Sequence, residues 1–251
     1  EAARAELVAF LDADDEWLSD HLKILVRLRA KYPEAGAYGT AYLIARRNLR
    51  IKVANFCAIP EEPWEGLLPS YFKAATLGAP PISASTVAIP QYILKEMGGF
   101  TTEEWMGEDV DLWGRIALKY PIAFSWDGKG IYHTEASNRA CNKVEPLAEA
   151  IFVRIAREAL DAGEVPLAIQ EDLREYITRR QMNRALGNIR AKRPDLAIPL
   201  LKDCTTTRLP NSKCLVLYFL AYVSIYMPSC AYEFLNNARQ IFKTVLCRTR
   251  G

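Results

Sequence analysis

The stretch LVAFLDADDEW, residues 7–17, passes from an apolar run to a group of acidic side chains. Residues 7–11 are continuously apolar, which predicts a buried strand of a parallel sheet. Asp12 closes this run, and Asp14 and Asp15 follow within three positions. Ligands bind at the carboxyl ends of strands in open α/β sheets. The first candidate site therefore lies at the end of this strand.

Strand-like and helix-like segments alternate after this stretch. Apolar spacing and turn residues predict helices at 20–31, 67–75, 91–97 and 108–119, and strands at 37–45, 51–56 and 83–89. This alternation predicts an α/β fold in which helices pack on a sheet.

The pattern changes after about residue 145. Residues 147–203 look helical throughout, with breaks at Gly163, Pro166 and Pro194. We place a domain boundary near residues 136–145. This gives an α/β domain over 1–140 and an all-α region over 145–251.

An apolar helix is expected at 214–227 inside the second region. No charged residue occurs from Cys214 to Tyr232, and Tyr218, Tyr222 and Tyr226 fall on one stripe of a helix. Its apolar run is shorter than the roughly 20 residues that cross a bilayer. Basic residues follow at Arg239, Lys243, Arg248 and Arg250. Three interpretations stay open: a peripheral membrane contact through 214–247, packing on the protein itself, and a membrane span.

Composition limits the partners and the compartment. The chain has 251 residues, a net charge of +2 and 50% hydrophobic residues, so it lacks the basic excess of a nucleic-acid-binding protein. Six cysteines are scattered without metal-ligand spacing, which is typical of reduced, mostly buried thiols in a cytoplasmic protein. The sequence begins at Glu1 without Met, and we expect a longer native N-terminus.

The acidic cluster suggests a divalent cation. In a D-x-D arrangement, Asp12 and Asp14 converge on one ligand when the backbone turns out of the strand. Mg²⁺ and Mn²⁺ take carboxylate and phosphate oxygens as ligands. The alternative is a solvated acidic loop at the start of the next helix.

Two further groups of residues carry candidate chemistry. Gly98-Gly99-Phe100 precedes Glu108 and Asp109, which either complement a helix dipole or face a cleft where a carboxylate accepts a proton. Of the two histidines, His21 is expected on the surface of a polar helix. His133 is open to a metal-ligand or cleft role and to a structural hydrogen bond.

Together these residues resemble the family 2 glycosyltransferases of the GT-A fold over roughly residues 1–140. Members show a strand that ends in "fLDaDDeW", then "GGF" and "gEDvDlw.R", and a tyrosine–histidine pair near the end of the domain. The matching segments here are 10–17, 98–100, 107–115 and Tyr132-His133.

The resemblance implies a fold, an activity and residue roles. It implies a GT-A mixed sheet flanked by helices that lacks its N-terminal nucleotide-binding part. It implies a metal-dependent, inverting transfer of a sugar from a nucleotide-diphosphate donor, most simply a UDP-sugar, to a glycan or lipid-linked acceptor. Asp12 and Asp14 would bind donor and metal with His133 as a further ligand, Asp109 would be the base, and Glu108 and Trp113 would shape the acceptor cleft.

The setting implied is cell-envelope or surface glycan synthesis at the cytoplasmic face of the inner membrane. No Gln-x-x-Arg-Trp follows the Glu-Asp pair, which favours a single transfer over processive synthesis. Two alternatives remain. A haloacid-dehalogenase-type phosphatase requires Thr or Val soon after the second Asp, where this chain has Asp15-Glu16-Trp17. A catalytically inactive GT-A-like domain would act as a peripheral membrane scaffold.

Overall fold

The computed structural model describes residues 3–46, 49–134, 142–202, 204–209 and 211–226 and divides into two compact units. The first, here the sheet unit, comprises Glu1–Asn142 and Ala150–Tyr176. The second, the helical unit, comprises Lys143–Glu149 and Ile177–Gly251. The boundary predicted at 136–145 falls for the most part on residues 135–141, outside the described residues.

The described strands of the sheet unit form one mixed sheet. They are β1 (Leu7–Ala9), β2 (Glu16–Trp17), β3 (Ala37–Arg46), β4 (Leu49–Val53), β5 (Glu65–Leu67), β6 (Val87–Pro90) and β7 (Ile122–His133). Their order is β1, β6, β3, β7, β2, with β4 on β3 and β5 on β7. Only β3 and β7 run parallel among these pairs. The predicted mixed α/β architecture is confirmed, while the two-residue β2 and three-residue β5 were not predicted.

The prediction of a parallel pairing for the first strand is wrong. β1 pairs with β6 alone among the described strands, and the pairing is antiparallel, with Val8 opposite Ile89. Its residues are half-buried rather than buried. An apolar run reports burial and not direction, and this strand lies at the end of the described strand order.

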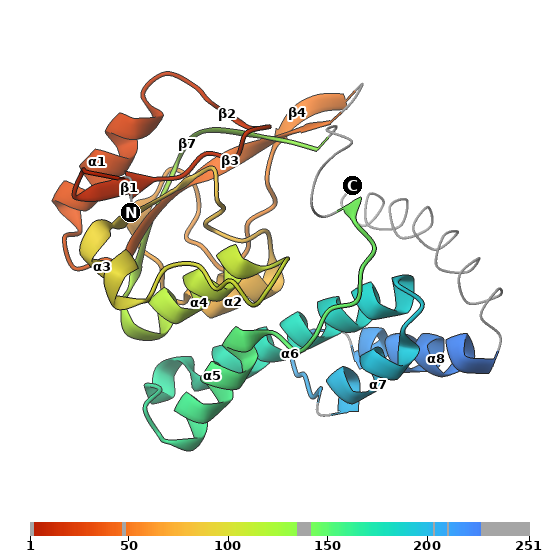
Figure 1. Ribbon diagram of the computed structural model, residues 1–251. Coiled ribbons are helices and arrows are strands. Elements are labelled where there is room, and N and C mark those ends of the chain that lie inside the picture. The colour runs from red at the N-terminus through yellow and green to blue at the C-terminus, as the bar shows by residue number, and fades with distance from the viewer. Residues whose placement is uncertain (1–2, 47–48, 135–141, 203, 210, 227–251) are drawn as a thin grey trace. The chain divides into compact units, whose positions relative to one another are not determined.

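Helices pack on both faces of the sheet (Figure 1). In the sheet unit they are α1 (His21–Lys31), α2 (Tyr71–Leu77), α3 (Gln91–Glu96), α4 (Glu108–Lys119), α5 (Ile151–Asp161) and the first part of α6 (Leu167–Arg190). Leu25 and Leu28 of α1 pack on Tyr38 of β3, with Ala88 and Ala123 beside them. The bounds of α4 are those predicted from its apolar spacing.

Aromatic rings join the helices on the other face. Phe72 of α2 and Phe152 of α5 stack with centroids 6.1 Å apart, and Tyr176 of α6 lies 5.4 Å from Phe72. Gly114 of α4 is required at the contact with α5, because a Cβ there would lie 2.5 Å from the Phe152 ring. These contacts fix α4, whose first turn carries Glu108 and Asp109.

The prediction that His21 lies on the surface is wrong. Its side chain is 1% exposed and stacks on Trp17, with ring centroids 5.0 Å apart. Neither imidazole nitrogen has a hydrogen-bond partner among the described residues. Burial without a partner disfavours the charged ring and lowers the pKa of His21 to about 4. The polar composition of the helix concealed this because Trp17 belongs to a neighbouring strand.

The helical unit is built around the end of α6, α7 (Pro194–Lys202) and α8 (Asn211–Tyr226). Its apolar cluster includes Ile189, Leu201 and Leu220, which are at most 5% exposed. The predicted breaks hold, since Pro166 precedes α6 and Pro194 begins α7. Asn188 binds the backbone of Leu147 through both amide atoms, at 2.7 and 2.9 Å.

One side of α8 packs in this cluster and another is exposed. Leu220 and Ala221 are buried, and Leu217 and Tyr218 pack against the cluster. The exposed apolar side chains are Leu215, Val216, Phe219, Tyr222, Ile225 and Tyr226. No described helix is long and apolar enough to cross a membrane. The predicted residues beyond Tyr226, including the basic tail, lie outside the described part of the chain.

The described cysteines differ from the prediction of mostly buried thiols. Cys57 and Cys204 are free and half-buried. Cys141, Cys230 and Cys247, and the side chain of Cys214, lie outside what the structure describes.

The buried His21 predicts a pH dependence of stability. Its folded pKa of about 4 lies below the unfolded value, so the unfolded state binds the proton first and stability falls as the pH drops from about 7 toward 4. Between pH 7 and pH 5 the free energy of unfolding should fall by about 2 kcal/mol more in the wild type than in His21→Gln. Urea titrations of both proteins at several pH values measure this difference. Equal pH dependence in the two would contradict the assignment.

Candidate active site

The acidic cluster lies in a tight turn between β1 and β2. The Asp15 N–H donates to the Asp12 carbonyl at 3.1 Å, which folds the D-x-D segment back on itself. Asp12, Asp14 and Asp15 each offer a carboxylate oxygen, and the three oxygens lie within 4.8 Å of one another. The turn thus brings together the two predicted donor-binding residues, Asp12 and Asp14, and places the carboxylate of Asp15 beside them.

Ser85, just before β6, fastens both ends of this turn. Its hydroxyl accepts the Asp12 N–H at 3.1 Å and donates to Asp15 Oδ2 at 2.5 Å. Its carbonyl accepts the Trp17 indole N–H at 2.7 Å. Ser85 is 2% exposed. Sequence reasoning missed it, and the signal was weak: three hydroxyl residues at 83, 85 and 86 beside an otherwise apolar strand.

The end of β7 reaches the same cluster. The His133 backbone N–H donates to Asp15 Oδ1 at 2.9 Å, so both oxygens of Asp15 hold neighbouring segments. The His133 imidazole Nε2 lies 3.5 Å from the Glu16 carboxylate. The structure therefore places His133 beside the acidic cluster, with its imidazole ring near the carboxylate of Glu16. Its role as a metal ligand stays a prediction.

Arg115 holds the loop that leads into α4. Its guanidinium pairs with Asp111 at 2.7 Å and donates to the carbonyls of Gly99, at 2.8 Å, and Met97. Gly99 has a φ of 73°, in the left-handed region that favours glycine. The Gly-Gly-Phe segment and the first turn of α4 are thus connected through one side chain.

Three aromatic rings bring the two motifs together. Phe10 precedes the acidic turn and lies 5.5 Å from Phe100 and 6.1 Å from Trp113, measured between centroids. Phe100 and Trp113 are 5.9 Å apart. Trp113 is 1% exposed, and its indole N–H has no partner among the described residues. The ring therefore supports the site by packing, and its predicted contact with an acceptor stays a prediction.

The negative charges of the two motifs lie close enough to act on one another. The pKa of Asp12 is raised, first by burial and then by the negative charges of Asp15, Asp14, Asp109 and Glu108. The predicted base Asp109 accepts the Val110 N–H at 2.7 Å at the start of α4. Among the residues that the structure describes, no basic side chain is a cause of this shift in pKa. Concentrated negative charge of this kind favours a bound cation.

The donor set fits a hard divalent cation. All three clustered groups are carboxylates, and Mg²⁺ and Mn²⁺ prefer oxygen ligands. The carboxylates of Asp12 and Asp14 make no hydrogen bond or ion pair with any residue that the structure describes, whereas Asp15 is engaged twice. Asp12 and Asp14 are therefore the residues that would hold the ion.

Comparison with known proteins gives a fold. No protein-family model and no curated protein sequence matches this chain. Among solved structures it is similar to S. aureus TarS 1–349 in complex with UDP-GlcNAc, with 16% identity, a TM-score of 0.51, and coverage of 90% of this chain and 69% of that one. It also matches the mannosyltransferase PcManGT from Pyrobaculum calidifontis in complex with GDP-Man and Mn²⁺, with 16% identity, a TM-score of 0.43, and coverage of 90% and 57%. The mixed sheet with its flanking helices is the GT-A fold of the glycosyltransferases.

Proposed function

We propose that this chain is an inverting glycosyltransferase that moves a sugar from a nucleoside-diphosphate donor to an acceptor hydroxyl in cell-envelope or surface glycan synthesis. The observation that carries the proposal is the convergence of two acidic motifs in a GT-A fold. Asp14 and Asp12 lie in one turn, and Asp109 and Glu108 are close enough to raise the pKa of Asp12. A UDP-sugar is the donor that we favour, since the similar TarS structure contains UDP-GlcNAc.

The proposed roles follow from position. Asp12 and Asp14 would hold a divalent cation, which would neutralise charge on the donor diphosphate. Asp109 takes the proton of the acceptor hydroxyl, and the acceptor oxygen bonds to the anomeric carbon. The bond from that carbon to the diphosphate oxygen breaks on the opposite face, which inverts the configuration. The products are a glycoside and a nucleoside diphosphate, with the proton on Asp109.

Nucleotide binding should depend on both the cation and Asp14. We expect one nucleoside diphosphate to bind in the presence of Mn²⁺, and Asp14→Asn to weaken this binding by about tenfold or more, about 1.4 kcal/mol per decade. Calorimetric titration of a panel of nucleoside diphosphates with and without Mn²⁺ measures it. Asp20→Asn, an exposed aspartate outside the cluster, is the matched control. Absence of metal-dependent binding would overturn the proposal and leave the scaffold alternative.

Asp109→Asn should separate binding from chemistry. The amide keeps the size of the side chain but accepts no proton, so turnover should fall by about 10²–10⁴-fold while nucleotide affinity changes far less. Donor hydrolysis or transfer rates, with the anomeric configuration of the product read by NMR, measure both points. A retained configuration, or full activity in Asp109→Asn, would contradict the inverting mechanism.

We also propose that the chain contacts a membrane peripherally through 214–247. The exposed Leu215, Phe219, Tyr222 and Tyr226 recur along α8 at spacings of four and three residues, as on an interfacial helix. The protein should co-sediment with anionic phosphatidylglycerol vesicles and less with neutral ones, and Phe219→Ser should reduce the bound fraction. Equal partition of wild type and Phe219→Ser would count against this contact.

A further inference from the structure

The parallel ladder between β3 and β7 is interrupted by a wide bulge. The two strands pair regularly up to Thr40 opposite Ser125 and again from Tyr42 opposite Gly130. Ala41 therefore faces four residues of β7, 126–129. Bulges of this kind redirect side chains and are frequent beside active sites. Gly128 is required here, since a Cβ would lie 2.2 Å from the Ala41 carbonyl oxygen.

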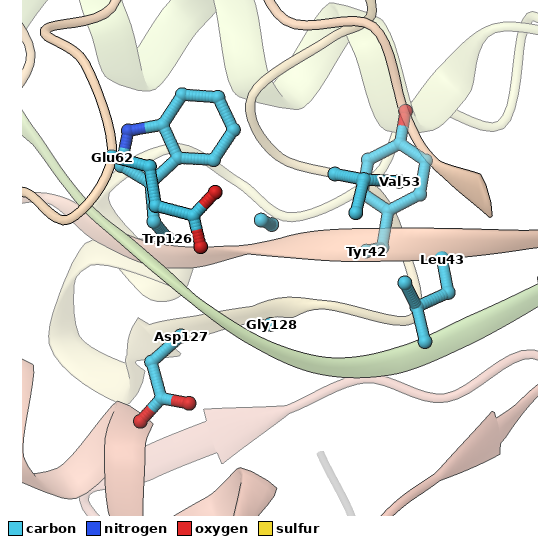
Figure 2. A pocket seen from close by; sticks show the side chains of 8 residues that line it. Tyr42, Leu43, Val53, Glu62, Trp126, Asp127 and Gly128 are labelled. Atoms are coloured by element: carbon cyan, nitrogen blue, oxygen red, sulfur yellow. The ribbon is translucent and has the colours of Figure 1, made fainter.

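The bulge is part of the wall of a cavity of about 250 Å³. Its size lies just below the range of about 300–1,000 Å³ that is usual for small-ligand pockets. Figure 2 shows Trp126 and Glu62 on one side of it and Tyr42 with Val53 on the other, with Asp127 nearby. None of these residues belongs to the acidic cluster described above.

Trp126 is a rigid platform on this wall. Its indole N–H donates to the Pro60 carbonyl at 2.8 Å, and its backbone N–H donates to Trp64 at 3.2 Å. Its ring packs edge-to-face on Phe56 and Phe124, with centroids 5.4 and 5.7 Å away. The ring is only half-buried, so part of it is open to a ligand that needs a flat apolar surface.

The charged side chains that line the cavity are carboxylates, which accept hydrogen bonds. Glu62 is exposed, and its carboxylate makes no hydrogen bond or ion pair with any described residue. Asp127 lies 3.8 Å from Arg27, which itself binds Glu65 more closely, at 2.6 Å. No basic side chain is among the described residues that line the cavity. This chemistry disfavours phosphates and carboxylates and favours a ligand with several hydroxyl donors.

The cavity is connected to the candidate active site along β7. Gly130, just past the bulge, packs on Thr86, where a Cβ would lie 2.5 Å from its methyl group, and Ser85 is the next residue back. Three residues further, the His133 N–H binds Asp15. Leu43, which also lines the cavity, pairs with Ile131, two residues before His133. The cavity and the candidate active site therefore adjoin the same stretch of β7.

We propose that this cavity is a subsite for a neutral or amino sugar of a glycan acceptor. The Trp126 ring covers the C–H face of the sugar ring, and Glu62 and Asp127 accept its hydroxyl hydrogens. That the bound sugar belongs to an acceptor rests on the proposed function. The binding of a sugar in the cavity does not depend on it.

Glycan binding tests the subsite without a measurement of activity. The full chain, without donor, is applied to an array of neutral and amino-sugar oligosaccharides, and the strongest ligand is then titrated. We expect Glu62→Gln to bind that ligand about tenfold more weakly because a charge-assisted hydrogen bond is lost. Glu61→Gln, the adjacent exposed glutamate outside the cavity, is the matched control and should bind as the wild type. Trp126→Phe, which keeps an aromatic ring, should also weaken binding.

Each outcome decides the proposal. No oligosaccharide bound, or equal binding by Glu62→Gln and Glu61→Gln, overturns it. If no sugar binds but tetramethylammonium binds tightly, the proposal is overturned in favour of a cationic ligand. Metal-dependent nucleotide binding with no glycan binding refutes the subsite and leaves the transferase standing. Glycan binding without metal-dependent nucleotide binding refutes the transferase and leaves the sugar subsite standing.

Discussion

The turn that carries Asp12 and Asp14 keeps its shape because the buried Ser85 hydroxyl accepts one hydrogen bond and donates another. It accepts the backbone N–H of Asp12 and donates to the carboxylate of Asp15. Asp15 in turn accepts the backbone N–H of His133. Segments that are about 70 and 118 residues apart along the chain are thus joined by two side chains. A hydroxyl can both donate and accept a hydrogen bond. An apolar side chain can do neither, so it could not replace Ser85 here.

This arrangement holds like charges together at a cost in free energy. Asp12 has a raised pKa because burial and four neighbouring carboxylates oppose its ionisation. The surrounding packing supplies the opposing stability: the rings of Phe10, Phe100 and Trp113 fix the strand end against α4, and Arg115 ties the preceding loop to Asp111. Acidic groups held at such a cost are typical of sites that bind a cation or move a proton.

Local patterns in the sequence predicted the elements well and the contacts between them poorly. The bounds of α4 followed from apolar spacing, and the breaks at Pro166 and Pro194 from backbone chemistry. The motifs predicted that Asp12, Asp14 and Asp109 act together, and the charges of Asp14 and Asp109 do raise the pKa of Asp12. The burial of His21 under Trp17, the position of Ser85 and the antiparallel pairing of β1 depend on distant partners. No spacing rule along the chain encodes such partners, because they arise only when the sheet assembles.

The bulge between β3 and β7 also constrains how this protein can vary in length. Two residue steps on β3, from Thr40 to Tyr42, correspond to five on β7, from Ser125 to Gly130, a surplus of three residues. An odd surplus reverses which face successive side chains occupy, since strand side chains alternate with a period of two. A change in length that keeps the contact between His133 and Asp15 must therefore be absorbed within the unpaired residues 126–129, so that the pairs from Gly130 to His133 stay in register.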